Sequence, residues 1–292
     1  MSAKLLLALL SLSVFYFIFY FADANGLRAL GDAAQHAQTL PGLDVPLRTR
    51  YTGLAPLDQL LTTLTVFFWP VGDGSQPALT LHSVAFSGTF ASAWILVTLE
   101  SWRKGSAGTA AAFPAVLGLT AQVLTFAFAT PLYALLHLCY STTATNPTTT
   151  NMRIPHTVLR ALPHVFTVAM FVPSLLMIVP LSETMTHDLK QICIAVWQPW
   201  PAYVAVLLVA AYLVGGRGDA DARKTASSLR LHRGAHRAAG VEVGLASVLA
   251  KVAALSVLAS PAGAAVELMW EREELFLRDA DADRAKAARG KK

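Results

Sequence analysis

Charge is the scarcest property of this sequence. Only 14% of the 292 residues are Asp, Glu, Lys or Arg, whereas a soluble globular domain carries about a quarter. Hydrophobic residues make up 54% of the chain, and the mean hydropathy is +0.49. This composition argues against an ordinary soluble domain and favours a protein of the lipid bilayer.

Motifs that bind metals or nucleotides are also lacking. The sequence has no Asp-Asp-x-x-Asp-type carboxylate cluster for magnesium and no His-Glu-x-x-His. It has no P-loop and no Gly-x-Ser-x-Gly motif. Heme, nicotinamide and flavin sites are likewise not indicated. We therefore expect no metal and no cofactor.

Cysteine is rare, and the positive net charge is explained by basic residues in the loops. Cys139 and Cys193 lie in or beside apolar stretches, so buried free thiols are a better interpretation than a disulfide.

The net charge of +5 would suit binding to a nucleic acid. The basic residues, however, cluster in loops that flank apolar blocks, where membrane proteins place them. We expect no nucleic-acid partner.

What the sequence has in abundance is apolar blocks of roughly 20 residues, the length that a helix needs to cross about 30 Å of hydrocarbon. Backbone groups in lipid must be paired within the segment, which favours helices, and the alternation typical of barrel strands is absent. The sequence therefore predicts an all-α fold, a polytopic membrane helix bundle of about seven transmembrane helices. The blocks lie at 4–22, 57–71, 79–99, 111–138, 157–181, 191–214 and 240–260.

These blocks divide the chain into four regions. A first transmembrane helix or signal anchor at 1–22 precedes a polar loop at 23–55, a membrane helix bundle at 56–262 and a charged C-terminal tail at 263–292. We favour a retained first helix over a signal peptide because the apolar run is long and ends in aromatic residues.

Three local features refine this prediction. A short amphipathic helix is expected at 27–38, within the polar loop. The block at 57–71 is short and opens with Asp58, so it is either tilted or enters the membrane without crossing. Pro131 lies inside the block at 111–138 and predicts a kink there.

Ionisable groups inside or beside these blocks are functional candidates, because a charge at membrane depth is costly unless it is paired or lines a cavity. Asp73, Glu100 and Asp188 are the acidic candidates. A carboxylic acid in an apolar cavity can donate a proton, and aromatic faces stabilise cations. Protonating an olefin or epoxide and guiding a carbocation needs these two features.

Simpler interpretations of the same residues stay open. Asp73 lies in a Gly-Asp-Gly-Ser turn and suits a turn former. Glu100 lies three residues before Arg103, a spacing that favours an ion pair at a helix end. The tryptophans near these acids can equally be anchors at the membrane interface.

Three stretches resemble a known family. They are WPVGDGSQPALTLH from Trp69 to His82, PLYALLHL from Pro131 to Leu138, and VPSLLMIVPLSETMTHDLKQICIAVWQPWPAYV from Val172 to Val204. Together they are similar to small integral-membrane proteins of fungal natural-product gene clusters. That group includes membrane-bound terpene cyclases of drimane-type meroterpenoid pathways. The resemblance covers roughly residues 55–258.

The resemblance implies a metal-independent terpene cyclase of the isomerase or lyase type, without diphosphate ionisation. Its substrate would be a hydrophobic molecule with a prenyl chain on an aromatic or polyketide core. Candidate catalytic residues are then Asp73, Glu100, Asp188, His82, His137 and Gln191, the last three orienting an acid or taking the final proton. Candidate substrate-binding residues are Trp69, Trp197, Gln198 and Trp200.

The resemblance further implies a multi-pass protein of the endoplasmic reticulum that works beside other pathway enzymes. Family members continue into further apolar sequence where this chain has its charged tail. The alternative is a non-enzymatic transporter or scaffold of a biosynthetic cluster. A transporter would often show inverted repeats, and we find no matching halves. A receptor-like seven-helix protein is disfavoured because its expected disulfide pair is absent.

Overall fold

The computed structural model describes residues 2–40, 42–146, 148 and 151–215. In this part of the chain the regular structure is helical, apart from one isolated bridge between Thr39 and Pro46. The all-α prediction is therefore confirmed for the described residues. The chain divides into two compact units. The first comprises 1–84, 113–139 and 162–208, and the second comprises 85–112, 140–161 and the described residues after 208.

The first helix of the first unit is long enough to cross a bilayer. It consists of α1 (Ala3–Val14), a π-helical segment (Phe15–Tyr20) and α2 (Phe21–Ala24), 22 residues together. At 1.5 Å per residue this is about 33 Å. The Ser2 side chain caps its start. Most of its Leu, Phe and Tyr side chains are exposed, as lipid-facing residues would be.

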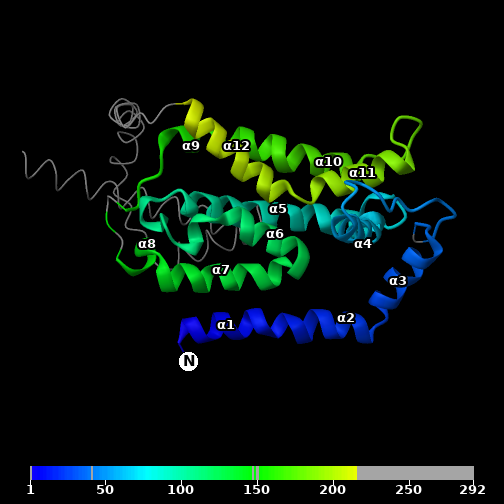
Figure 1. Cartoon of the computed structure of the whole chain (residues 1–292), viewed down its shortest axis with the longest axis horizontal. Coiled ribbons are helices and arrows are strands. Elements are labelled where there is room, and N and C mark those ends of the chain that lie inside the picture. Colours follow the sequence, from blue (N-terminus) through cyan, green and yellow to red (C-terminus); the bar gives the residue numbers. More distant parts are fainter. Residues whose placement is uncertain (1, 41, 147, 149–150, 216–292) are drawn as a thin grey trace, which may run out of the picture. The chain divides into compact units, whose positions relative to one another are not determined.

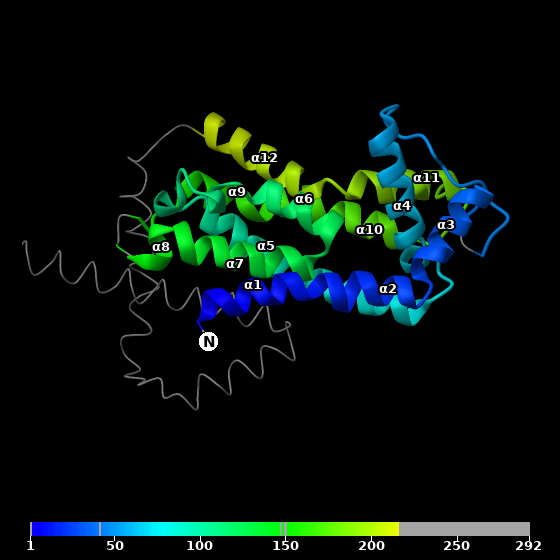
Figure 2. The same cartoon turned by 60° about the horizontal axis from the view of Figure 1, so that its bottom comes forward.

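Two further helices of the first unit follow the polar loop. The amphipathic helix predicted at 27–38 is present as α3 (Leu27–Ala37). The short block at 57–71 forms α4 (Ala55–Gly72), which is not among the helices apolar enough to span a membrane. In Figure 1 α4 is seen nearly end-on, and Figure 2 shows it running across α10 (Val172–Ile178) and α11 (His187–Trp197).

The block predicted at 79–99 is α5 (Pro77–Ser101), a single helix of 25 residues. Its first eight residues belong to the first unit and the rest to the second. Two short 3-10 turns follow, at Lys104–Ser106 and Ala110–Ala112. The length of α5, about 37 Å, is enough to cross the hydrocarbon core.

The block at 111–138 is broken into α6 (Pro114–Leu124) and α7 (Phe126–Tyr140). The break is at Thr125, with φ +72° and ψ 154°, and not at Pro131, which lies inside α7. The two helices are about 16 and 22 Å long, so each is too short to cross 30 Å. Figure 1 shows the chain turning back after α6.

The remaining described helices begin with α8 (Thr142–Thr145). A continuous helix then covers His156–Ile178, made of α9 (His156–Phe166), a π-helical segment (Thr167–Phe171) and α10. α11 and α12 (Trp200–Val214) form a pair bent by 59°.

Within the described residues, three helices are long and apolar enough to span a membrane, or four if the bent pair is one span. These are Ala3–Ala24, Pro77–Ser101, His156–Ile178 and the pair α11–α12. They correspond to the predicted blocks at 4–22, 79–99, 157–181 and 191–214. The block predicted at 240–260 and the charged tail at 263–292 lie outside the described residues.

Candidate functional site

The predicted acid Asp188, at the start of α11, is paired with Arg48 in the first unit. Arg48 Nε and Nη2 donate to the two carboxylate oxygens over 2.9 and 2.7 Å, a bidentate arrangement that favours the ionised carboxylate. Gln191 accepts a hydrogen bond from the Arg48 backbone N–H at 2.7 Å and donates to the Pro46 carbonyl at 3.1 Å. Asp188 and Gln191 therefore both form hydrogen bonds with Arg48, a residue of the polar loop.

Asp58 holds the end of that loop against the first turn of α4. Its Oδ1 accepts from the backbone N–H groups of Tyr51 and Thr52 at 3.1 and 2.7 Å and from the Thr52 hydroxyl at 2.9 Å. Its Oδ2 accepts from the Gly53 N–H at 3.0 Å. These donors, the Thr52 N–H above all, hold the pKa of Asp58 below its ordinary value. Asp58 is thus an anchored carboxylate.

Lys190 is a fully buried cation that joins two helix ends. Its Nζ donates to the carbonyl of Gly72, the last residue of α4, and to that of Val179, just after α10, at 2.6 Å. Carbonyl ends of helices carry partial negative charge and stabilise cations. Gly72 must be small, because a Cβ there would collide with the Met177 carbonyl. Lys190 therefore clamps α4 and α10 to α11.

Asp73, directly after α4, has the geometry of a turn former. Its Oδ1 accepts from the backbone N–H of Ser75 at 2.9 Å and from the Ser75 hydroxyl at 2.7 Å. This is the side-chain-to-backbone pattern of an Asx turn. The simpler of the two interpretations of Asp73 accounts for its contacts.

Two of the predicted tryptophans lie in the packed part of the first unit. Trp69 on α4 is fully buried, and its ring stacks with His187 at 6.0 Å between centroids. Trp197 packs edge-on against Phe68 at 5.3 Å, and its Nε1 donates to the Ser174 hydroxyl at 2.8 Å. These contacts join α4, α10 and α11.

The bend between α11 and α12 carries a buried polar side chain. Gln198 is 4% exposed, and neither its amide nitrogen nor its amide oxygen has a hydrogen-bond partner among the described residues. Trp200, two residues further on, is fully buried and packs against Phe166. Buried polar atoms normally find a partner, so the Gln198 amide is a candidate for binding a ligand.

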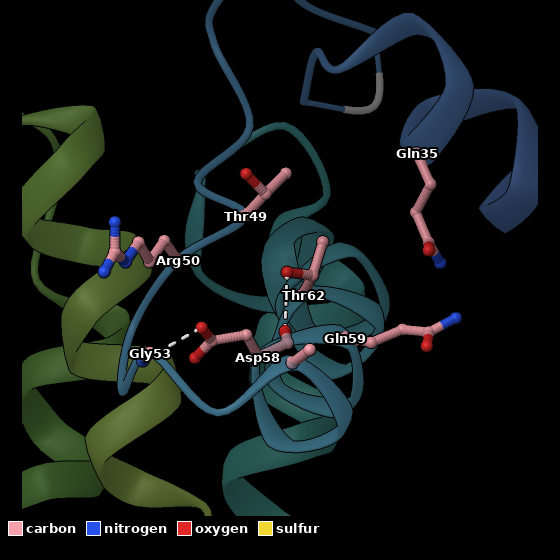
Figure 3. Close-up of a pocket in the computed structure, with 8 residues that line it drawn as sticks. Gln35, Thr49, Arg50, Gly53, Asp58, Gln59 and Thr62 are labelled. Carbon is pink, nitrogen blue, oxygen red and sulfur yellow. Dashed lines mark hydrogen bonds between the residues drawn. The ribbon is translucent and has the colours of Figure 1, made fainter.

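A polar pocket of about 390 Å³ opens beside the start of α4 in the first unit (Figure 3). In Figure 3 the side chains of Gln35 on α3 and Gln59 on α4 point toward one another, whereas the Arg50 guanidinium points away from them. The lining residues are Gln35, Thr49, Arg50, Gly53, Ala55, Asp58, Gln59 and Thr62.

In the second unit, the predicted acid Glu100 lies in a buried polar network at the end of α5. It is 8% exposed, and its Oε2 accepts from Nε of Arg103 at 2.6 Å, which is the i,i+3 pair expected from the sequence. Arg103 also donates to the Met152 carbonyl at 2.7 Å. The Thr143 hydroxyl donates to Glu100 Oε1. Among the three candidate acids, Glu100 is the one whose carboxyl group is buried.

The same helix carries a row of aromatic rings that precedes this network. Phe86 and Phe90 stack at 6.2 Å, and Phe90 contacts Trp94 at 6.0 Å. Trp94 is 2% exposed. An acid and aromatic faces, the two features that carbocation chemistry needs, therefore occur together on one helix of the second unit.

The two predicted histidines lie on α5 and α7. His82 is exposed on the part of α5 that belongs to the first unit. His137 lies on α7 and stacks with Tyr133 at 6.0 Å. Within the described residues there is no group of three or more His, Cys, Asp or Glu side chains that could hold a metal ion.

Sequence analysis did not identify several residues of these clusters. Arg48 is 140 residues from Asp188, and no local spacing signals that pair. Thr143 and Ser141 lie in a Thr-rich loop that looks like an ordinary polar connection. The row at 86, 90 and 94 was detectable, because its i,i+4 spacing places the rings on one helix face.

Comparison with known proteins identifies the family. The model of the CtvD domain matches residues 3–232 and 225–277. The chain belongs to the CtvD family. The resemblance to fungal membrane terpene cyclases is thereby confirmed at the level of the family, whereas the drimane-type meroterpenoid pathway stays a prediction.

Several curated relatives of the chain are named as terpene cyclases. The chain is 32% identical to terpene cyclase ctvD of Aspergillus terreus over 65% of this chain and 54% of that protein. It is 30% identical to terpene cyclase ascI of Acremonium egyptiacum (80% and 60%) and 34% identical to terpene cyclase janA of Penicillium janthinellum (76% and 62%). The chain thus spans 54–62% of the length of these curated relatives. No solved structure matches it.

Proposed function

We propose that this CtvD-family chain is a membrane-bound terpene cyclase of secondary metabolism. It protonates an olefin or epoxide of a prenyl chain carried on an aromatic or polyketide core, and the resulting cation closes the rings. The names of the CtvD relatives support the activity. The observation that carries the mechanism is the buried Glu100 carboxyl group on the helix of Phe90 and Trp94.

Glu100 is the best of the three candidate acids. Asp188 is 60% exposed, whereas the Glu100 side chain is 10% exposed, and Asp73 is engaged in its own turn. In Glu100 the two oxygens have different partners, since Arg103 engages Oε2 and a hydroxyl engages Oε1. Oε1 is therefore the oxygen on which we place the transferable proton.

The proposed reaction is an isomerisation, so the substrate and the product contain the same atoms. The proton on Glu100 forms a new C–H bond with an olefin, or an O–H bond with an epoxide whose C–O bond breaks. Carbon–carbon bonds then form as the cation moves along the chain, next to the faces of Phe90 and Trp94. A final C–H bond breaks and releases one proton. No diphosphate leaves, so the reaction needs no metal to neutralise it.

Within the first unit alone, two features suit the oxygen atoms of a bound small molecule. The pocket of Figure 3 offers the side-chain amides of Gln35 and Gln59 and the Thr49 hydroxyl, which suit a hydroxylated core. The amide of Gln198, without a partner among the described residues, suits a single hydroxyl, carbonyl or epoxide oxygen. Trp69, Trp197 and Trp200 remain proposed substrate-binding residues of the first unit.

The acid assignment is tested by changing each carboxyl group to its amide. Glu100→Gln, Asp73→Asn and Asp188→Asn are expressed separately in a heterologous fungus, and microsomes are fed a prenylated, epoxidised aromatic. Loss of general acid catalysis typically costs 10²- to 10⁴-fold, so we expect Glu100→Gln to lose the cyclised product. Asp73→Asn and Asp188→Asn retain it. Full activity of Glu100→Gln at equal protein level would refute the assignment.

Topology and location belong to the same proposal. We propose a multi-pass protein of the endoplasmic reticulum with lipid around its exposed apolar helices. Of the about seven crossings predicted from the sequence, the described residues provide three or four. We propose that the block at 240–260 adds another, and that the blocks at 57–71 and 111–138 enter the membrane without crossing it. Fluorescence microscopy of a tagged chain with an endoplasmic-reticulum marker tests the location.

A transporter remains the second candidate, favoured by the bend between α11 and α12. Broken helices with buried polar groups form binding sites in many transporters, and Gln198 lies at such a break. The two functions give different products. A cyclase converts its substrate to a compound of equal mass with fewer double bonds, whereas a transporter moves it unchanged.

A further inference from the structure

The amphipathic helix α3 begins directly after the first candidate membrane span. That span ends at Ala24, and its last turns carry Tyr20, which is 61% exposed, and the exposed Asp23. An exposed tyrosine followed by a charged residue is typical of the level at which a span leaves the hydrocarbon. Between Ala24 and Leu27, the first residue of α3, the chain can extend by at most about 11 Å. The first turn of α3 therefore lies close to the lipid headgroups wherever this span crosses a bilayer.

The turn between the span and α3 is held by backbone hydrogen bonds. The N–H of Asn25 donates to the Phe21 carbonyl and that of Gly26 to the Asp23 carbonyl, both at 3.0 Å. Gly26 has φ +80°, a left-handed conformation with which glycine commonly ends helices. Figures 1 and 2 both show the chain turning sharply at this point. Helix α3 thus leaves the axis of the span instead of extending it.

One side of α3 is fixed against the rest of the first unit. Ala34 is buried, and Nε2 of Gln35 donates to the Thr63 hydroxyl on α4 at 3.2 Å. Gln35 also lines the pocket of Figure 3. These contacts set the rotation of α3 about its own axis, and with it the side that stays uncovered.

The uncovered apolar side of α3 carries two leucines. Leu27 is 49% exposed and Leu30 is 70% exposed, and their i,i+3 spacing places them next to one another on the helix surface. Arg28 and Asp32 are exposed on the polar side. A single exposed leucine is ordinary on a protein surface. Two on one face of an amphipathic helix, at the end of a span, fit the boundary between headgroups and acyl chains.

We propose that the start of α3 lies in the membrane interface, with Leu27 and Leu30 inserted at the boundary between lipid headgroups and acyl chains. The charged residues from 23 to 37 are Asp23, Arg28 and Asp32, so this segment has no basic cluster for anionic lipids. The contact is therefore apolar, and a zwitterionic phosphatidylcholine bilayer is sufficient for it. This inference rests on the proposed multi-pass topology and is independent of the proposed catalytic acid.

Depth-dependent fluorescence quenching tests this placement. Leu27→Cys, Leu30→Cys and Arg28→Cys are made separately in the full chain with both native cysteines replaced, labelled with an environment-sensitive fluorophore and reconstituted into phosphatidylcholine vesicles. We expect lipids with a nitroxide near the headgroup to quench the labels at 27 and 30 at least about twofold more strongly than lipids with a nitroxide near the chain end. Arg28→Cys is the matched control on the polar side, and aqueous iodide should quench its label instead.

Three results would overturn the interfacial placement. Iodide quenching at Leu30→Cys equal to that at Arg28→Cys would place this side of α3 in water. Strongest quenching of the Leu30→Cys label by the chain-end nitroxide would place it deep in the hydrocarbon. Protection of that label from iodide and from both lipid nitroxides would show that protein, such as a second copy of the chain, covers the leucines.

A label within the first span separates failure of the topology from failure of the interfacial placement. Leu12 lies near the middle of that span and is 61% exposed, so the chain-end nitroxide should quench a label at Leu12→Cys most strongly. Absence of this quenching would overturn the crossing and, with it, the placement of α3. Quenching as expected at Leu12→Cys together with iodide quenching at Leu30→Cys would refute the placement of α3 alone. Size-exclusion chromatography before reconstitution ensures that only folded variants are compared.

Discussion

At the scale of single residues, Asp58 makes the folded protein sensitive to acid. Its pKa is lowered in the folded state by backbone donors, first the Thr52 N–H, so the ionised form contributes stability at pH values above the ordinary aspartate pKa of about 3.9. That contribution is lost as the pH falls through the lowered folded-state pKa. We expect Asp58→Asn to lower the melting temperature at neutral pH and to flatten its decline in acid.

Thermal unfolding of the detergent-solubilised chain between pH 7 and pH 3 measures this effect. Exposed Asp44→Asn is the control, since surface substitutions usually change stability by less than about 0.5 kcal/mol. An Asp58→Asn curve parallel to that of the wild type at every pH would show that the carboxylate contributes nothing.

Removing the Lys190 ammonium group should also lower the unfolding free energy. Lys190→Met keeps an unbranched side chain, one atom shorter, but leaves the Gly72 and Val179 carbonyls without their cation. Hydrogen bonds to charged groups contribute about 1.5–3 kcal/mol, so we expect a loss of that order. Unfolding of Lys190→Met is compared with that of exposed Lys104→Met, and equal stability of the two variants would contradict the clamp.

Thr125 is strained, and glycine should relieve the strain. A β-branched residue at φ +72° and ψ 154° occupies a region used almost only by glycine and costs about 1–3 kcal/mol. Its hydroxyl has no partner among the described residues. Thr125→Gly is therefore expected to raise the unfolding free energy by roughly 1 kcal/mol. Thr120→Gly, in the interior of α6, should lower it by about the same amount.

At the scale of elements, we expect α6 and α7 to form a hairpin that enters and leaves the membrane at one face, because each is too short to cross it. The segments just before and after it meet in the second unit, where the Thr142 hydroxyl donates to the Gly105 carbonyl. Lys104→Cys and Thr145→Cys, made with both native cysteines replaced, should therefore react with a membrane-impermeant maleimide from the same side of sealed microsomes. Labelling from opposite sides would show that this block crosses.

The sequence predicted elements where the signal is local. Apolar runs of about 20 residues became long helices, and the amphipathic pattern at 27–38 became α3. The break at Thr125 could not be predicted, because threonine does not usually end a helix. Pro131 predicted a kink at another position, which lies inside α7. Glu100 and Arg103 were found through their i,i+3 spacing. Arg48 with Asp188 and Thr143 with Glu100 were not, because their contacts span 140 and 43 residues.

At the scale of the whole molecule, we place the chemistry and the scaffolding in different clusters. In the first unit, Asp58, Lys190 and the Arg48–Asp188 pair hold loops and helix ends together. In the second, Glu100 accepts hydrogen bonds from Arg103 and Thr143 at the end of the helix that carries Phe90 and Trp94. Substitutions in the first set should act mainly on stability, and those in the second mainly on turnover.

The activity of the whole chain is tested directly by purifying it in detergent and incubating it with a prenylated, epoxidised aromatic in the presence of EDTA. Mass spectrometry and NMR should detect a product of unchanged mass with fewer double bonds, at the same yield with and without the chelator. Recovery of the unchanged substrate across several such compounds, with folded protein present, would contradict protonation-initiated cyclisation by this chain.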